Sequence, residues 1–323
     1  MVTPVAARYP TRIAFAVVDF DESDHVDAGQ IEDRRGSGGG GFGGLRGGPI
    51  AIGTGGLGVV GLVITLLLTF LGKGAGGIPG FDPNSVSNID STGSAAPPAS
   101  EIETTCAGAT AASDNATFIA CANTNIQSFW STLFANSGQQ YTETKLVLFT
   151  QGTQSGCGQA SASTGPFYCP ADQKVYIDLD FFKVLASQLG GPNTDFAQAY
   201  VLAHEIGHHL QTILGTEGQV RDSQQRNPSQ QNSLSVRLEL QADCYAGVWG
   251  KSAFEAGKVS NTEISEALDA AASVGDDRIQ KTTTGRVNPE SFTHGSSEQR
   301  MRWFSKGFDT GDADACDTFS GGI

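Results

Sequence analysis

The sequence predicts an α+β protein, in which a mainly helical domain with a small β-sheet follows a disordered N-terminus and one transmembrane helix. Residues 195–214 and 235–250 carry apolar side chains at helical spacing. Residues 145–149 and 174–179 are short, apolar and rich in β-branched or aromatic side chains, as strands are. Residues 50–71 form an apolar stretch without a charge, which is typical of a membrane span.

Residues 1–49 are expected to be a disordered segment on the cytoplasmic side. Residues 1–35 are polar and acidic, with seven Asp or Glu against four Arg. Residues 36–48 contain nine glycines in 13 positions. Glycine loses the most backbone entropy on ordering, so this stretch is expected to be a flexible tether.

The expected transmembrane helix is residues 50–71, with the sequence IAIGTGGLGVVGLVITLLLTFL. As a helix it would be about 33 Å long, which matches a hydrocarbon core of roughly 30 Å. A long buried core helix is the alternative. Arg34, Arg35 and Arg46 precede the span, whereas only Lys73 follows soon after it. The positive-inside rule then places the N-terminus in the cytoplasm and the rest of the chain outside.

Residues 72–100 are expected to be a linker, because they are rich in Gly, Pro, Ser and Asn and lack an apolar period. A folded domain is expected over residues 101–323. The chain has a formal net charge of −14, which argues against a nucleic-acid binder because such proteins need a basic patch. Nothing in the sequence indicates an oligomeric state.

All six cysteines lie in the expected outer domain, and none belongs to a Cys-x-x-Cys pair. An even number on the oxidising side of a membrane favours disulfides over a zinc site. Six cysteines allow many pairings, which the sequence does not resolve. Two pairings that close local loops are favoured, Cys157–Cys169 and Cys106–Cys121. They leave Cys244 to pair with Cys316.

The expected helix over residues 195–214 contains His204-Glu205-x-x-His208. Residues four apart on a helix differ by about 40° in direction, so both imidazoles can reach one ion, and they suit Zn²⁺. Glu205 is rotated about 100° from His204 around the helix, so it is not placed to bind the ion but can reach a water bound to it. It is expected to act on that metal-activated water as general base, and then as general acid. The alternative is a pair of surface or capping histidines. His209 lies on another face and is interpreted as a packing residue or as a residue that supports a ligand, not as a ligand itself.

A third ligand is expected from the helix over residues 235–250. Glu239 and Asp243 are four residues apart and share a face. We assign Glu239 as the third zinc ligand and Asp243 as the carboxylate that orients a ligating histidine, although the reverse assignment stays open. A solvated acidic face is the other alternative, which the many apolar neighbours make less favourable.

Near the C-terminus, the segment SFTHGSSEQR contains two further candidates. His294 is a candidate hydrogen-bond donor to the oxyanion that forms when water attacks a carbonyl. Arg300 is expected to pair with Asp243 or another acid. A helix-capping loop with a structural arginine explains the segment equally well. Upstream, the strand at residues 174–179 precedes the histidine helix, and as an edge strand it could hold an extended peptide.

The combined motifs resemble one family, the bacterial neutral zinc metallopeptidases. The resemblance implies a zincin-like fold of the gluzincin type and a membrane-anchored endopeptidase with one Zn²⁺ per chain, so that residues 101–323 would be the metallopeptidase domain. It also implies the roles given above to Glu239, Asp243 and His294. Cys121 and residues 1–30 depart from the family pattern. The matching stretches are IEDRRG at 31–36, GCG at 156–158, GPFYCPAD at 165–172, VYIDL at 175–179, AHEIGHH at 203–209, SVRLELQADCYAGVWG at 235–250, GDDRIQ at 275–280 and SFTHGSSEQRMRWFSKGFDTGD at 291–312.

Two other functions are compatible with the same residues. One is a membrane-tethered binding or assembly protein that keeps a metal-stabilised fold without turnover, which predicts loss of Glu205 or of a ligand. The other is a zinc hydrolase that acts on a non-peptide amide. All four site residues are present, which favours hydrolysis, and the sequence does not indicate a particular substrate.

Overall fold

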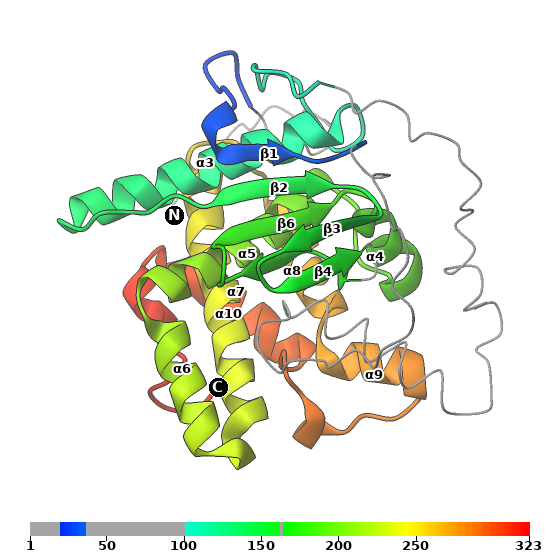
Figure 1. Cartoon of the computed structure of the whole chain (residues 1–323), viewed down its shortest axis with the longest axis vertical. Helices are drawn as coiled ribbons and strands as arrows, with labels where there is room; N and C mark the ends of the chain where they lie inside the picture. The colour runs from blue at the N-terminus through cyan, green and yellow to red at the C-terminus, as the bar shows by residue number, and fades with distance from the viewer. Residues whose placement is uncertain (1–19, 37–100, 162–163) are drawn as a thin grey trace, which may run out of the picture.

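A computed structural model of the chain describes residues 20–36, 101–161 and 164–323 (Figure 1). The expected transmembrane helix at 50–71 and the expected linker at 72–100 lie outside these residues. Within the described ranges, no helix combines the length and the apolar character needed to cross a membrane.

The described residues form a mainly helical α+β fold with a small sheet, which confirms the predicted class. The α-helices are α3 (Asn115–Asn136), α4 (Phe181–Leu189), α5 (Asp195–Ile213), α6 (Thr216–Arg226), α7 (Gln231–Glu255), α8 (Asn261–Ser273), α9 (Asp276–Thr284) and α10 (Ser297–Thr310). The strands are β1 (Ile31–Asp33), β2 (Lys145–Phe149), β3 (Gly152–Ser155), β4 (Gly158–Ser161), β5 (Phe167–Cys169) and β6 (Lys174–Asp178). Short 3-10 helices are η1 (Ala28–Gln30), η3 (Pro228–Gln230), η4 (Pro289–Ser291) and η5 (Ala313–Cys316).

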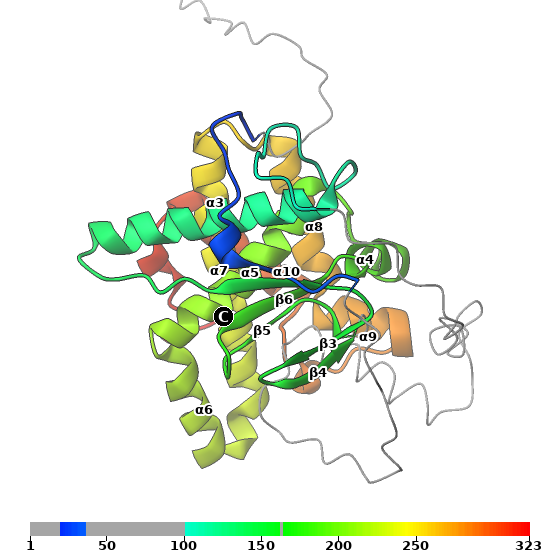
Figure 2. The same ribbon diagram turned by 45° about the horizontal axis from the view of Figure 1, so that its top comes forward.

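The main sheet has the strand order β1-β2-β6-β5. β1, β2 and β6 are parallel, and β5 runs antiparallel to β6. β2 and β6 are almost entirely buried, as expected for strands covered on both faces. α3 packs against β2, and α5 packs against β5 and β6, so the histidine helix lies directly beside the sheet (Figures 1 and 2).

Four helices, α5, α7, α8 and α10, pack together into the helical core. Glycines allow the closest approaches. A Cβ at Gly207 of α5 would lie 3.0 Å from the Cα of Ala242 in α7. Gly247 of α7 and Gly307 of α10 each face the partner helix's backbone so closely that a side chain would clash. The contact at Gly207 brings the histidines of α5 next to the acidic residues of α7.

The sheet corrects one expectation about the N-terminal segment, because residues 20–36 are ordered. Ile31 of β1 is in register with Leu146 of β2, and Asp33 with Leu148. Phe20 is buried and its ring lies 5.9 Å from that of Phe118. The expectation of disorder over residues 1–49 is therefore wrong for residues 20–36, and the folded unit is not confined to residues 101–323.

Charge pairing explains why residues 20–36 are ordered although their acidic composition predicts disorder. Glu32 binds Lys174 at 2.7 Å and Arg34 at 2.7 Å, so its charge is compensated at the edge of the sheet. Asp24 pairs with Lys258 at 2.5 Å. An acidic segment of this kind can order because its carboxylates meet basic partners from distant parts of the chain.

Two details of the predicted strands also need correction. β6, the strand at residues 174–178, is interior and not an edge, because β5 lies outside it. The edge strand next to α5 is β5, which was not predicted from the sequence. β3 and β4, which form an antiparallel hairpin, were not predicted either. Each of these strands has only three or four residues, too few for a clear alternating pattern.

All three disulfides form in the favoured pairing. Cys106 bonds to Cys121 and Cys157 to Cys169, closing local loops, and Cys244 bonds to Cys316. The last bond ties α7 to the C-terminal segment. The described residues contain no free cysteine.

Candidate metal centre

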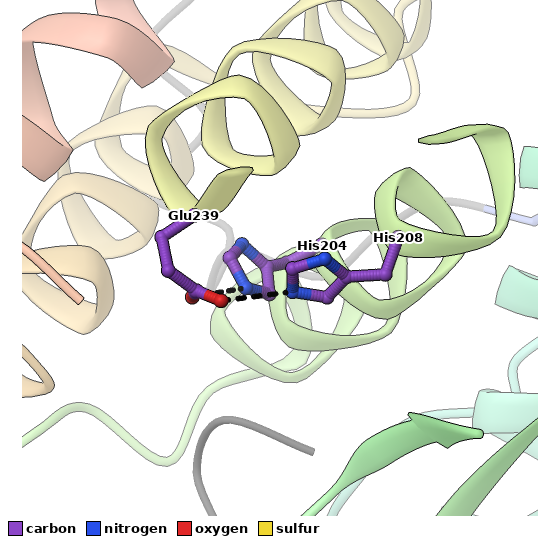
Figure 3. Close-up of side chains that lie close together, drawn as sticks. All are labelled: His204, His208 and Glu239. Atoms are coloured by element: carbon purple, nitrogen blue, oxygen red, sulfur yellow. Dashed lines mark ion pairs between the residues drawn. The ribbon is translucent and has the colours of Figure 1, made fainter. Parts of the chain in front are cut away.

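The histidine pair lies on α5, one helical turn apart, and Glu239 lies on the neighbouring helix α7. Figure 3 shows both imidazoles and the carboxylate pointing towards one another. Nε2 of His204 is 3.3 Å from Oε2 of Glu239, and Nε2 of His208 is 3.3 Å from Oε1. One ligand atom from each residue lies within 4.8 Å of the others. The structure thus brings together the three residues that the sequence indicated as ligands.

The chemistry of this donor set fits a zinc ion. Ligand atoms about 2.0–2.2 Å from a tetrahedral zinc lie about 3.3–3.6 Å from one another, and each Nε2 atom lies 3.3 Å from an oxygen of Glu239, within that range. Nε2 of His208 and both carboxylate oxygens of Glu239 are buried and have no hydrogen-bond partner among the described residues. Leaving such polar atoms without a partner is costly, and a bound cation would satisfy all three.

Electrostatics keep Glu239 ionised. Burial alone would raise the pKa of this carboxyl, but the facing histidines hold it well below its usual value. Burial also disfavours the charged form of His208, yet the charge of Glu239 outweighs burial and raises its pKa to about 9 when no metal is bound. A metal would therefore compete with a proton for His208.

Asp243 supports His204 from the side opposite the ligand cluster. Its Oδ1 lies 2.8 Å from Nδ1 of His204 and accepts a 2.6 Å hydrogen bond from the hydroxyl of Tyr200. Arg300 donates to both oxygens of Asp243, at 2.8 Å each. Burial opposes ionisation of Asp243, but Arg300 and His204 lower its pKa to about 2.

This arrangement bears on the two carboxylates whose roles the sequence left open. Glu239 faces the Nε2 atoms of both histidines, whereas Asp243 faces an Nδ1 atom. The geometry favours Glu239 as the ligand and Asp243 as the orienting carboxylate. Arg300 pairs with Asp243, as one of the two sequence interpretations expected.

Glu205 is buried beside the histidines, with 2% of its surface exposed. Burial raises the pKa of its carboxyl, although the two histidines and the backbone N–H of Tyr168 in β5 act in the opposite direction. A carboxyl whose pKa is raised towards neutrality is suited to taking up and releasing a proton.

His294 is buried and held by Asp276 at the start of α9. Nδ1 of His294 lies 2.9 Å from Oδ1 of Asp276, and Oδ2 accepts hydrogen bonds from the backbone N–H groups of Thr293, His294 and Gly295. The next residue, Gly295, faces Val236 and Leu240 of α7, on either side of Glu239 in sequence. The cluster of ligand atoms itself does not include His294.

Sequence reasoning missed several residues that support the site. Gln211 lies 2.9 Å from Nδ1 of His208, and Tyr200 and Asp276 hold Asp243 and His294. Gln211 is one turn beyond His208 on the same helix, and that spacing was the available signal. Asp276 lies in the GDDRIQ stretch, which had received no role. His209, as expected, is a packing residue, bonded to the carbonyl of Thr142.

A His–His–Glu cluster presented by two helices, with a buried glutamate beside it, matches the donor set of one class of zinc hydrolases. The chain belongs to the family described as "Putative neutral zinc metallopeptidase", whose model matches residues 22–319. This confirms the resemblance found in the motifs.

Three similar proteins are described as uncharacterized. The uncharacterized protein YpfJ of Escherichia coli strain K12 is 43% identical over 303 residues, which cover 94% of this chain and 98% of the relative. Mb2605 of Mycobacterium bovis and Rv2575 of Mycobacterium tuberculosis strain H37Rv are each 48% identical over 190 residues, which cover 56% of this chain and 64% of each relative. No solved structure matches the chain.

Proposed function

We propose that the protein is a zinc-dependent endopeptidase that hydrolyses peptide bonds with a metal-activated water. The observation that carries the proposal is the cluster of His204, His208 and Glu239, next to the buried carboxyl of Glu205. Nε2 of His208 and both oxygens of Glu239 lack a hydrogen-bond partner among the described residues. One Zn²⁺ per chain would be held by the two Nε2 atoms and the carboxylate. When bound, zinc would supply Lewis acidity and lower the pKa of a coordinated water to about 7.

The residues around the cluster divide the work of hydrolysis. The Glu205 carboxylate accepts the proton of the attacking water and delivers it to the amide nitrogen that leaves. Asp243 accepts a hydrogen bond from Nδ1 of His204 and so keeps the lone pair of Nε2 directed at the ligand position. Arg300 keeps Asp243 ionised and in place.

His294 is the proposed oxyanion donor. Asp276 holds the ring of His294, because its Oδ1 lies 2.9 Å from Nδ1 of the imidazole. Asp276 in turn accepts three backbone hydrogen bonds, which fix its position. The pair therefore acts as one unit in the proposal.

The proposed substrate is an extended peptide that pairs with the outer edge of β5. β5 is an edge strand, and the backbone N–H of its Tyr168 points to Glu205. A peptide added to this edge would run past the proposed general base. In this proposal β5, and not the strand at residues 174–179, pairs with the peptide substrate.

We also propose that the described domain works outside the cytoplasm and associates with the membrane through residues 50–71. Three disulfides support an oxidising compartment, since such bonds are rare in the cytoplasm. The apolar, uncharged sequence of residues 50–71 supports the association.

The proposal is tested with the full chain and its Glu205→Gln variant, by measuring zinc content and cleavage of a peptide library. We expect both proteins to hold about one zinc, and the variant to lose at least about 100-fold in cleavage rate, because a general base contributes 10²–10⁴-fold. Chelation should abolish cleavage and zinc should restore it. Zinc retention with unchanged cleavage in the variant would exclude the mechanism.

The same library separates the alternatives. Zinc binding without cleavage of any peptide or non-peptide amide would support the non-catalytic binding protein. Cleavage of non-peptide amides alone would support the other hydrolase.

A further inference from the structure

We propose that Gln211 and Gln241 form a hydrogen-bonded relay that sets the tautomer of His208 and thereby tightens metal binding. This inference rests on the proposed zinc site but not on peptide hydrolysis. His204 has a carboxylate partner, Asp243. His208 has no such partner at Nδ1; it contacts an amide instead, and that amide is the first member of a chain.

The relay runs from α5 through α7 to the C-terminal segment. Nδ1 of His208 is 2.9 Å from Oε1 of Gln211. Nε2 of Gln211 donates to the carbonyl of Leu238 at 2.7 Å and to Oε1 of Gln241 at 3.2 Å. Nε2 of Gln241 donates to the carbonyl of Cys316 at 3.1 Å.

The direction of each hydrogen bond follows from the two main-chain carbonyls, which can only accept. The Cys316 carbonyl requires Gln241 to present its NH₂ group there, so the Gln241 oxygen faces Gln211. That oxygen and the Leu238 carbonyl both require the NH₂ group of Gln211. The Gln211 oxygen must then face His208, and because it only accepts, Nδ1 of His208 must carry the proton.

The consequence at the ligand cluster is a fixed tautomer. With the proton on Nδ1, a neutral His208 has its lone pair on Nε2, the atom that faces Glu239. A histidine that must first change tautomer or turn its ring binds a metal more weakly, and the relay removes that cost.

Burial and a covalent bond hold the relay in place. Gln211 and Gln241 are 1% and 6% exposed, so water does not readily replace their partners. The terminal carbonyl belongs to Cys316, whose side chain is bonded to Cys244 of α7. Cys244 directly follows Asp243 in sequence. The same disulfide therefore helps to hold both Asp243, which contacts His204, and the carbonyl of Cys316, which ends the relay from His208.

The relay adds no charge to the site. Its members are neutral amides, and the carboxylate that supports the other histidine is paired with Arg300. Glu239 is the carboxylate that faces both Nε2 atoms. The two glutamines and the Asp243–Arg300 pair add no net negative charge, so they would not weaken the Lewis acidity of a bound cation.

The experiment measures the zinc dissociation constant of the full chain by competition with a chromogenic chelator. We expect Gln211→Leu to weaken zinc binding about 10–100-fold, the range found when partners of metal-binding histidines are removed. Gln241→Leu should weaken it less, since the Leu238 carbonyl still orients Gln211. Gln198→Leu is the matched control, because Gln198 is also buried on α5 but bonds to Asn193, and it should leave the constant unchanged.

A fourth variant tests the direction of the relay. Gln211→Glu keeps an acceptor for His208 but replaces the donor that serves Leu238 and Gln241. We expect it to bind zinc more weakly than the wild type. Wild-type affinity in this variant or in Gln211→Leu would overturn the proposal.

A measurement on the wild-type protein tests the relay even if a variant does not fold. In the zinc-loaded protein, nitrogen NMR should find that the Nδ1 proton of His208 exchanges slowly with solvent, because Gln211 accepts its hydrogen bond. Fast exchange of that proton would overturn the relay. A wild type that binds no zinc would refute the proposed function itself, which is a different result.

Discussion

At the scale of single residues, the site depends on charges that are buried in compensating pairs. Asp243 and Arg300 are both almost fully buried, and Arg300 contacts both oxygens of the carboxylate. Taking either charge out of water is costly, and the pair offsets that cost only while both members are present. Removing one partner should therefore lower the free energy of unfolding by more than the loss of its hydrogen bonds alone.

The variant Arg300→Met tests this. It leaves the Asp243 carboxylate buried without its cation, so we expect the free energy of unfolding to fall by about 3–5 kcal/mol. Zinc affinity should fall as well, because Asp243 holds His204. The control is Arg302→Met, an exposed arginine on the same helix, measured by the same denaturant titration. Equal stabilities for the two variants would contradict the prediction.

Much of the site could be predicted from local spacing. His204 and His208, and Glu239 and Asp243, are each four apart on a helix, and that spacing alone places each pair on one face. Gln241 and Asp276 could not be found in this way, because their partners come from distant segments. Their roles depend on tertiary packing, which leaves no periodic trace in the sequence.

At the scale of elements, helices α5 and α7 and the apolar strands β2 and β6 were predicted, whereas the three-residue strands β1 and β5 were not. α5 and α7 have enough turns for an apolar period to show. β5 has three residues, and β1 lies in an acidic stretch whose composition favours disorder. Pairing with β2 and salt bridges from Lys174 and Arg34 override that local preference.

Helix α8 carries a buried charge that costs stability. Glu263 is 1% exposed; its Oε2 accepts a 2.7 Å hydrogen bond from the backbone of Ser260, and its Oε1 has no partner among the described residues. Burial raises the pKa of this carboxyl, and the nearby charges of Glu266 and Asp195 add to the effect. The folded state therefore binds this proton more tightly than the unfolded state does.

The sign of the pH dependence follows. Above the folded-state pKa the ionised carboxylate destabilises the fold, and the cost disappears as the pH falls through that pKa. Glu263→Gln keeps an acceptor for Ser260 without the charge, so the melting temperature should rise at neutral pH, and the gain should shrink in acid. Glu298→Gln, an exposed glutamate in the first turn of α10, is the control for the helix dipole. A lower melting temperature for Glu263→Gln at neutral pH would contradict this account.

At the scale of the whole molecule, β1 constrains how the chain meets a membrane. Residues 20–36 are hydrogen-bonded to the same domain as residues 101–161, through β1 and through the bridge between His25 and Thr105. Segments of one folded domain lie on one side of any bilayer. A single crossing by residues 50–71 would place them on opposite sides, and the 22 residues of that stretch are too few for two helical crossings of about 20 residues each. The pairing of β1 is thus incompatible with an N-terminal segment in the cytoplasm and a domain outside.

We therefore predict that residues 20–36 share the compartment of the domain. In the double variant His25→Cys/Thr105→Cys the new cysteines occupy bridged positions, so they should form a disulfide in the protein isolated from cells, because antiparallel neighbours lie within the Cα separation that a disulfide needs. Peptide mapping under non-reducing conditions detects it, and the two single variants are the controls. A membrane-impermeant maleimide should also label Ser23→Cys and Gln225→Cys alike in intact cells, since both positions are exposed. Labelling of one position only, without the cross-link, would show that the chain crosses the membrane between them and that β1 does not pair with β2 in the cell.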